Sequence, residues 1–227
     1  MRNYIKFLLV VCMIVFNASP LASRNIPGYI ITKNSDTLIG EIKVSHFNIL
    51  TADFLFGQFN IEQLCTQVYF RASDTRRFKK YNAWDINGFG FKHKNENYKF
   101  QSFILKSNTP LKKDKDRHRF LLLCFSGKVL LYKDFKRLIE YNNPDQLLIQ
   151  NFGSTYLYYE YYLFNEKIGL TKAEISKDIK SLTELLKLYD FENDFIETMT
   201  ANARLRDITK ILIKYEYWKE IREVKLI

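Results

Sequence analysis

Histidines and carboxylates are the side chains of this sequence that could carry acid–base chemistry. The three histidines, His46, His93 and His118, are isolated from one another, and none stands at a spacing that metal ligands use. The sequence contains neither the G-x-S-x-G turn of a serine nucleophile nor the H-E-x-x-H helix of a zinc protease. We therefore predict no catalytic residue, no metal site and no bound cofactor.

Carboxylates are numerous, and four of them could supply a general acid and a general base from different parts of a sheet: Asp53, Glu62, Asp74 and Asp85. Spacing along the chain does not show which of them meet. A secreted hydrolase that uses scattered carboxylates or a histidine therefore remains the alternative to a binding protein. A cleft with several converging titratable groups would favour the enzyme, whereas a flat or tyrosine-lined surface would favour binding.

One segment interleaves positive charge with aromatic rings, namely Arg76-Arg77-Phe78-Lys79-Lys80-Tyr81. Surfaces that bind polyanions combine these two kinds of side chain, because cations attract the anionic groups and rings stack on the units that carry them. The segment predicts a polyanion site made of Arg76, Arg77, Lys79 and Lys80. The competing interpretation is the solvated face of a strand.

The run Tyr156 to Phe164 contains five tyrosines and reads as one strand. Alternation places Tyr156, Tyr158 and Tyr162 on the same face. Tyrosine buries a large ring and still needs a partner for its hydroxyl group, which suits the border between a core and a wet surface. We predict an aromatic contact surface for a glycan or a protein, with a sheet–helix interface as the competing interpretation.

The start of the chain has the order of a secretory signal peptide. A cationic segment, Met1 to Lys6, precedes the apolar run Phe7 to Phe16 and the small residues of Ala18 to Ser23. An apolar run of this length is too short for a membrane-spanning helix, which needs roughly 20 residues. We predict a signal peptide over residues 1–22, a mature chain without a transmembrane segment, and a location in the periplasm, at the outer membrane or outside the cell.

The positive net charge of the chain favours anionic partners, but it limits the choice of partner only weakly. The whole chain has a formal net charge of +10, and loss of Arg2 and Lys6 with the signal peptide lowers it to +8. Long-range attraction between such a chain and anionic surfaces weakens as salt is added. For an exported protein we expect an envelope glycan, a glycolipid or a protein as partner, and no nucleic acid. Cys65 and Cys124 would remain after processing, and an oxidising compartment would permit a disulfide.

Hydrophobic periodicity predicts a strand-rich body. Residues 28–32 and 37–44 read as a hairpin, since the second run alternates and Asn34-Ser35-Asp36 supplies a turn. Gly40 inside this strand indicates a bulge or a close backbone approach. A second hairpin is centred on Ser126-Gly127. The other expected strands cover residues 67–72, 89–92, 98–105 and 155–164.

The period changes near Ile168. Thr171-Lys172-Ala173-Glu174 has the capping-box pattern of a helix start, and apolar residues then recur at helical spacing as far as Tyr215. We expect two or three amphipathic helices over residues 171–219. The predicted fold class is α+β, an antiparallel β-rich body followed by a short C-terminal helical segment. The expected divisions are a signal peptide at 1–22, a β-rich domain at 23–166 and helices packed on it at 167–227.

Four short blocks carry a resemblance to a known group of proteins: Gly28-Tyr29-Ile30-Ile31, Asp36 to Ile42, Ala83 to Phe89, and Ser126 to Tyr132. In this order they make the chain similar to uncharacterised exported proteins of Bacteroidetes-type Gram-negative bacteria, which open with a G-Y-I…D-T-L-x-G-x-I hairpin. The resemblance implies an exported β-rich domain with a helical tail. It implies no activity and assigns no functional residue.

Overall fold

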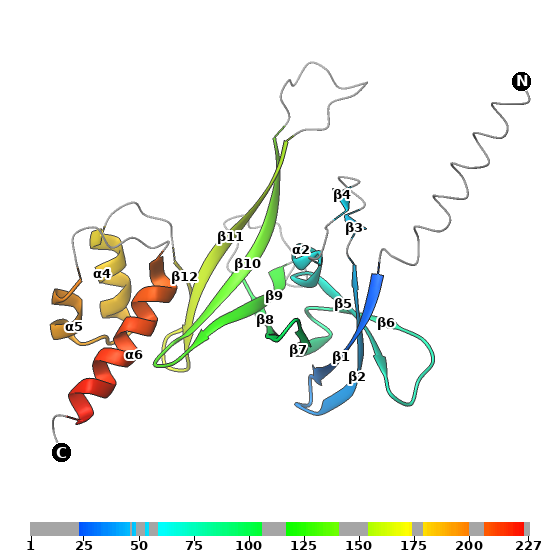
Figure 1. Cartoon of the computed structure of the whole chain (residues 1–227), viewed down its shortest axis with the longest axis horizontal. Helices are drawn as coiled ribbons and strands as arrows, with labels where there is room; N and C mark the ends of the chain where they lie inside the picture. The colour runs from blue at the N-terminus through cyan, green and yellow to red at the C-terminus, as the bar shows by residue number, and fades with distance from the viewer. Residues whose placement is uncertain are drawn as a thin grey trace, which may run out of the picture. The chain divides into compact units, whose positions relative to one another are not determined.

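The computed structural model describes residues 23–45, 47–48, 53–54, 59–105, 117–140, 154–173, 179–199 and 207–224 (Figure 1). The chain divides into two compact units. Unit 1 takes in the described residues up to Phe120 together with residues 137–140 and 154–157, and unit 2 takes in residues 121–136 and the described residues from Tyr158 onward. These units do not follow the expected division between residues 166 and 167.

Unit 1 is mainly an antiparallel sheet. Its strand order is β9-β8-β7-β1-β2-β5-β6. The strands of this sheet are β1 (Ser23–Thr32), β2 (Thr37–Ser45), β5 (Gln67–Ala72), β6 (Lys79–Asn82), β7 (Ile86–His93), β8 (Glu96–Ile104) and the start of β9 (His118–Ser126). A separate two-stranded pair joins β3 (Phe47–Asn48) to β4 (Asp53–Phe54).

Alternation along these strands separates a buried face from a wet one. In β2, Gly40, Ile42 and Val44 are buried, whereas the residues between them are more exposed. The buried face carries an aromatic cluster, in which the Phe89 ring stacks on Phe100 at 4.6 Å and meets Phe120 edge-on at 4.9 Å. Such pairs stabilise a core by about 1 kcal/mol beyond the area that they bury.

A short helix, α2 (Ile61–Leu64), contributes to the same core. Its N-cap is Asn60, whose side-chain oxygen accepts a hydrogen bond from the Gln63 backbone N–H at 3.1 Å. Leu64, the last residue of α2, and Cys65, which follows it, are both buried. The Phe120 N–H donates to the Cys65 carbonyl oxygen at 2.9 Å. The core of unit 1 therefore lies on one side of the sheet.

Unit 2 combines a sheet with three helices. Its strand order is β12-β11-β10-β9. The remaining elements of unit 2 are β10 (Leu130–Glu140), β11 (Ser154–Asn165), β12 (Gly169–Ala173), α4 (Ile179–Leu188), α5 (Asn193–Glu197) and α6 (Ile208–Val224). The helices α4, α5 and α6 lie together at the C-terminal end of the chain (Figure 1). Buried apolar residues of all three helices pack in one cluster, as expected from their helical spacing.

Apolar residues from both kinds of element form the core of unit 2. Leu131, Tyr161 and Leu163 come from the sheet, and Leu186 and Leu212 come from the helices. The fold is therefore β-rich α+β, as the sequence predicts. Among the described helices, none is both long enough and apolar enough to cross a membrane. The described part of the chain also contains no disulfide between Cys65 and Cys124.

The expected helix start at Thr171 is wrong. Thr171 lies in β12, opposite Leu163 of β11. The turn before β12 explains this strand, because Gly169 adopts a φ of +82° and the Asn165 side chain accepts a hydrogen bond from the Ile168 N–H at 2.8 Å. The pairing of β12 with β11 outweighs the local capping pattern. The first described residue of α4 is Ile179.

Candidate functional site

The strand register brings several charged side chains together on the wet face of the unit 1 sheet. We call it the outer face, because its side chains point away from the aromatic core. Strand alternation and pairing assign these side chains to it: Asn25, Pro27, Tyr29, Ile39, Glu41, Lys43, Tyr69, Arg71, Lys80, Lys92, Asn97, Lys99 and Gln101.

Four exposed lysines lie on the outer face and come from four different strands. Lys43 of β2 is opposite Tyr69 of β5, and Tyr69 is opposite Lys80 of β6. Lys92 of β7 and Lys99 of β8 occupy the same face on the other side of β1. Since neighbouring strands are about 4.8 Å apart, Lys43 and Lys80 stand about 10 Å from each other. Cations at this spacing can contact successive charges of an extended polyanion.

Negative charge is scarce on this surface. Among the described residues that the strand register assigns to the outer face, Glu41 is the only acidic one. It accepts a hydrogen bond from Arg71 and forms an ion pair with it. The Arg71 guanidinium also stacks over the Phe78 ring at 4.8 Å. Glu41 is thus neutralised within the face. The four lysines therefore give the outer face a net positive charge of its own.

The predicted polyanion cluster is divided by the geometry of β6. Arg76 and Arg77 lie exposed in the turn before this strand. Lys80 belongs to the outer face, whereas Lys79 points to the other side, where its ammonium group lies 5.0 Å from the centre of the Tyr81 ring. Because β6 is an edge strand, its lysines also hinder pairing with another chain.

The predicted tyrosine surface is divided by burial. Tyr158 is 39% exposed, but Tyr162 is only 5% exposed and donates its hydroxyl hydrogen to Glu160 at 2.9 Å. Tyr156 belongs to β11, and its side chain lies outside the described residues. Of the described pair, only Tyr158 offers ring surface to a partner.

Unit 2 brings together a second group of charges that sequence spacing did not indicate. Glu160 of β11 accepts hydrogen bonds from Lys136 of β10 at 2.5 Å and from Lys172 of β12 at 2.7 Å. Lys136 also forms an ion pair at 3.6 Å with Asp134, which is fully buried. Both carboxylate oxygens of Glu160 are engaged, because Lys136 and the Tyr162 hydroxyl donate to Oε2 and Lys172 donates to Oε1.

This network stabilises Glu160 as a carboxylate. Burial raises the pKa of Glu160, but the hydrogen bonds from Lys136, Lys172 and Tyr162 outweigh burial and bring the pKa to about 2. A carboxyl group that stays ionised at neutral pH does not act as a general acid there. The network joins β10, β11 and β12 through this carboxylate and gives Glu160 no role as a general acid.

Three of the carboxylates and histidines named from the sequence, Asp74, Asp85 and His93, have separate surroundings in the described part of the chain. Asp85 accepts hydrogen bonds from the Asn82 backbone and side chain, and Asp74 lies exposed in the turn between β5 and β6. The His93 ring packs edge-on against Phe59 at 5.8 Å. His46 and the side chain of Asp53 lie outside the described residues. Across the part of the chain that the structure describes, no group of three or more histidine, cysteine or acidic side chains could hold a metal ion.

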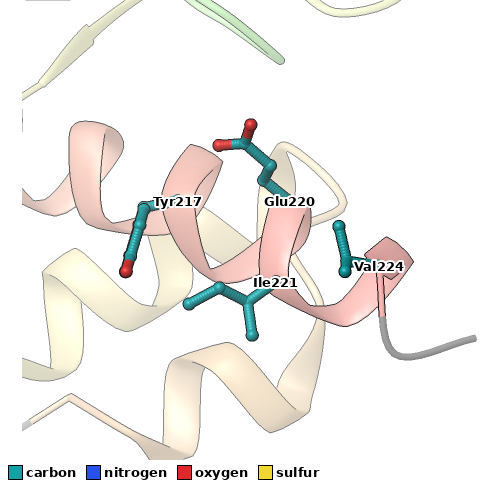
Figure 2. Close-up of a pocket in the computed structure, with 4 residues that line it drawn as sticks. All are labelled: Tyr217, Glu220, Ile221 and Val224. Carbon is teal, nitrogen blue, oxygen red and sulfur yellow. The ribbon is translucent and has the colours of Figure 1, made fainter.

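A recess of about 380 Å³ lies on α6 and is lined by Tyr217, Glu220, Ile221 and Val224 (Figure 2). All four side chains project from this one helix. They form its exposed side, roughly opposite the face that buries Ile208, Leu212 and Tyr215. Its lining contains one carboxylate, Glu220, and one phenol, Tyr217, beside two aliphatic side chains, which is not the convergence of several acid and base groups expected of an active site.

Sequence reasoning missed three of the four outer-face lysines. Lys43 could have been found, since it alternates with Ile42 and Val44 in a strand that the pattern already predicts. Lys92 follows the buried Phe91, and Lys99 follows the half-buried Tyr98. This pattern places each lysine on the wet face of its own strand, but it does not show that this face is the one that carries Lys43. Their convergence depends on the order β8-β7-β1-β2, which local patterns do not determine.

Comparison with protein families, with curated proteins and with solved structures finds no match to this chain. The outer face and its charges are therefore the features of this chain that bear on its function.

Proposed function

We propose that this chain is an exported, non-enzymatic protein that binds an anionic glycan of the cell envelope on the outer face of unit 1. The observation that carries the proposal is the convergence of Lys43, Lys80, Lys92 and Lys99 on one exposed face whose only carboxylate is paired with Arg71. Exposed cations recognise carboxylated or phosphorylated sugars through charge, and the attraction is screened by salt.

Export is supported by the order of charge, apolar residues and small residues at the start of the chain. Cleavage after Ala22 would keep the described strand β1 (Ser23–Thr32) in the mature chain. N-terminal sequencing of the native protein is expected to give Ser23 or Arg24 as the first residue. Recovery of the protein with Met1 in place from the cytoplasmic fraction would contradict export and would exclude an envelope glycan as the natural ligand.

Binding is tested with a polyuronate, a polymer of carboxylated sugars, and a variant that carries Lys43→Gln, Lys80→Gln, Lys92→Gln and Lys99→Gln. We expect about 100-fold weaker binding in this variant, since an exposed charge contact contributes up to about 1 kcal/mol and 1.4 kcal/mol is a factor of ten. The fold should be retained, because exposed charge changes usually alter stability by no more than about 0.5 kcal/mol. Titration at several salt concentrations gives the affinities.

The matched control removes the same charge from unit 2 through glutamine at four exposed lysines: Lys187, Lys210, Lys214 and Lys219. This variant should bind nearly as tightly as the wild type. A third variant with glutamine at Arg76, Arg77, Lys79 and Lys80 should show a smaller loss than the outer-face variant, because only Lys80 is shared. Equal losses in all three variants would mean that net charge alone drives binding, which would refute a site on the outer face.

A further inference from the structure

One aromatic ring on the outer face lies flat on the sheet. A Cβ atom added to Gly90 would stand 2.6 Å from the Oη atom of Tyr29, 2.7 Å from Cζ and 2.9 Å from Cε1. A point at these distances from three bonded atoms lies out of the ring plane, over the hydroxyl end of the ring. One face of the Tyr29 ring therefore rests on the backbone of β7, and only a glycine there leaves room for it.

The other face of the Tyr29 ring is turned away from the sheet, and Tyr29 is accordingly half-buried. Among the described residues, no second ring and no cation lies against it. Its neighbours follow from the register, since Tyr29 is opposite Ile39 of β2, and Gly90 is opposite both Tyr29 and Lys99 of β8. The ring extends across a position that has no side chain, toward the exposed Lys99.

We propose that Tyr29 is a stacking platform for one sugar ring of the bound glycan and that Lys99 binds the acidic group of that sugar. The proposal rests on the function proposed above and specifies the ligand as a chain of anionic sugar units. The C–H bonds on one side of a pyranose ring are weakly positive and fit the negative face of an aromatic ring. A carboxylate or phosphate on the edge of that sugar would lie where the Lys99 ammonium group can reach it.

Charge along the rest of the face agrees with an extended ligand. Lys92 is two residues from Gly90 on the same face, and Lys43 and Lys80 lie beyond Tyr29 on the other side of β1. A polymer that crosses the strands would thus meet cations on both sides of the Tyr29 platform. A single-stranded nucleic acid would stack on tyrosine as well, and the test therefore includes it.

The test measures binding of an oligouronate, a neutral oligosaccharide of equal length and single-stranded DNA of equal charge to four proteins: the wild type, Tyr29→Phe, Tyr29→Leu and Lys99→Gln. Tyr29→Phe keeps the ring and should bind the oligouronate like the wild type. Tyr29→Leu should bind about tenfold more weakly with unchanged salt dependence, because leucine covers Gly90 but offers no π face. Lys99→Gln should bind severalfold more weakly and show less salt dependence.

Circular dichroism and thermal unfolding show whether each variant is folded. Gly90→Ala is a second test of the Tyr29 platform, because it keeps the tyrosine but displaces its ring. If Tyr29→Leu and Gly90→Ala both bind like the wild type while the four-lysine variant loses affinity, stacking on Tyr29 is refuted and the proposed function stands. If the wild type binds none of the anionic probes, both are refuted. Equal affinity for the DNA, with the same dependence on Tyr29, would refute an anionic sugar as the ligand.

Discussion

Leu212→Asp is expected to destabilise unit 2 by about 4 kcal/mol or more. Leu212 is 1% exposed and belongs to the cluster that joins α6 to the strands and the other helices. A carboxylate at this position would have to be neutralised or remain buried without a partner, and both cost free energy. Denaturant unfolding monitored by far-ultraviolet circular dichroism measures the loss.

The neighbouring residue provides the control. Ile213 is 56% exposed on the opposite side of α6, and Ile213→Asp should change the free energy of unfolding by no more than about 0.5 kcal/mol. The two variants have the same charge and differ by one position in the helix. If they unfold at the same denaturant concentration, the assignment of buried and exposed faces of α6 is wrong.

Glu160→Gln is expected to remove about 2 kcal/mol of stability at neutral pH and to change how stability depends on acid. The folded-state pKa of Glu160 is about 2, below its ordinary value of 4.5, because three donors hold the carboxylate form despite its burial. A lowered pKa stabilises the folded state above pH 4.5, and this contribution is lost as pH falls from 4.5 toward 2. Wild type and variant should therefore converge near pH 2.

Unfolding free energies measured at intervals from pH 7 to pH 2 test this convergence. Glu166→Gln is the matched control, since Glu166 lies exposed in the turn between β11 and β12. Its stability curve should run parallel to that of the wild type. A constant difference between wild type and Glu160→Gln over the whole range would show that the stabilising effect of Glu160 does not come from its negative charge.

Much of the local structure follows from periodicity. The predicted strand at residues 67–72 is β5 at the same bounds, and the hairpin around Asn34-Ser35-Asp36 joins β1 to β2. Gly40 is indeed a close approach, because a Cβ atom there would lie 2.1 Å from the Arg71 carbonyl oxygen. The apolar helix positions Leu182 and Leu186 are buried as expected. These features depend on neighbours in sequence, which explains why the pattern predicts them.

The features that escaped prediction depend on distant pairing. β12 forms because β11 supplies a partner for Thr171, against the local helix signal. β6 is short, and its four residues carry no clear alternation. The outer face requires Lys43, Lys80, Lys92 and Lys99 from four strands, and the Glu160 network requires three more strands in register. Alternation along the sequence predicts on which face of its strand a residue lies, but it does not predict the order of the strands in the sheet.

Chemical labelling of lysine amines with and without a polyuronate tests the central claim most directly. Mass spectrometry reports the reactivity of every lysine, so the outer face and unit 2 are compared in one sample. The account predicts that saturating polyuronate protects Lys43, Lys80, Lys92 and Lys99, leaves Lys187, Lys210, Lys214 and Lys219 reactive, and loses its protective effect at high salt. Equal protection of both sets, or protection confined to unit 2, would contradict a glycan-binding site on the outer face.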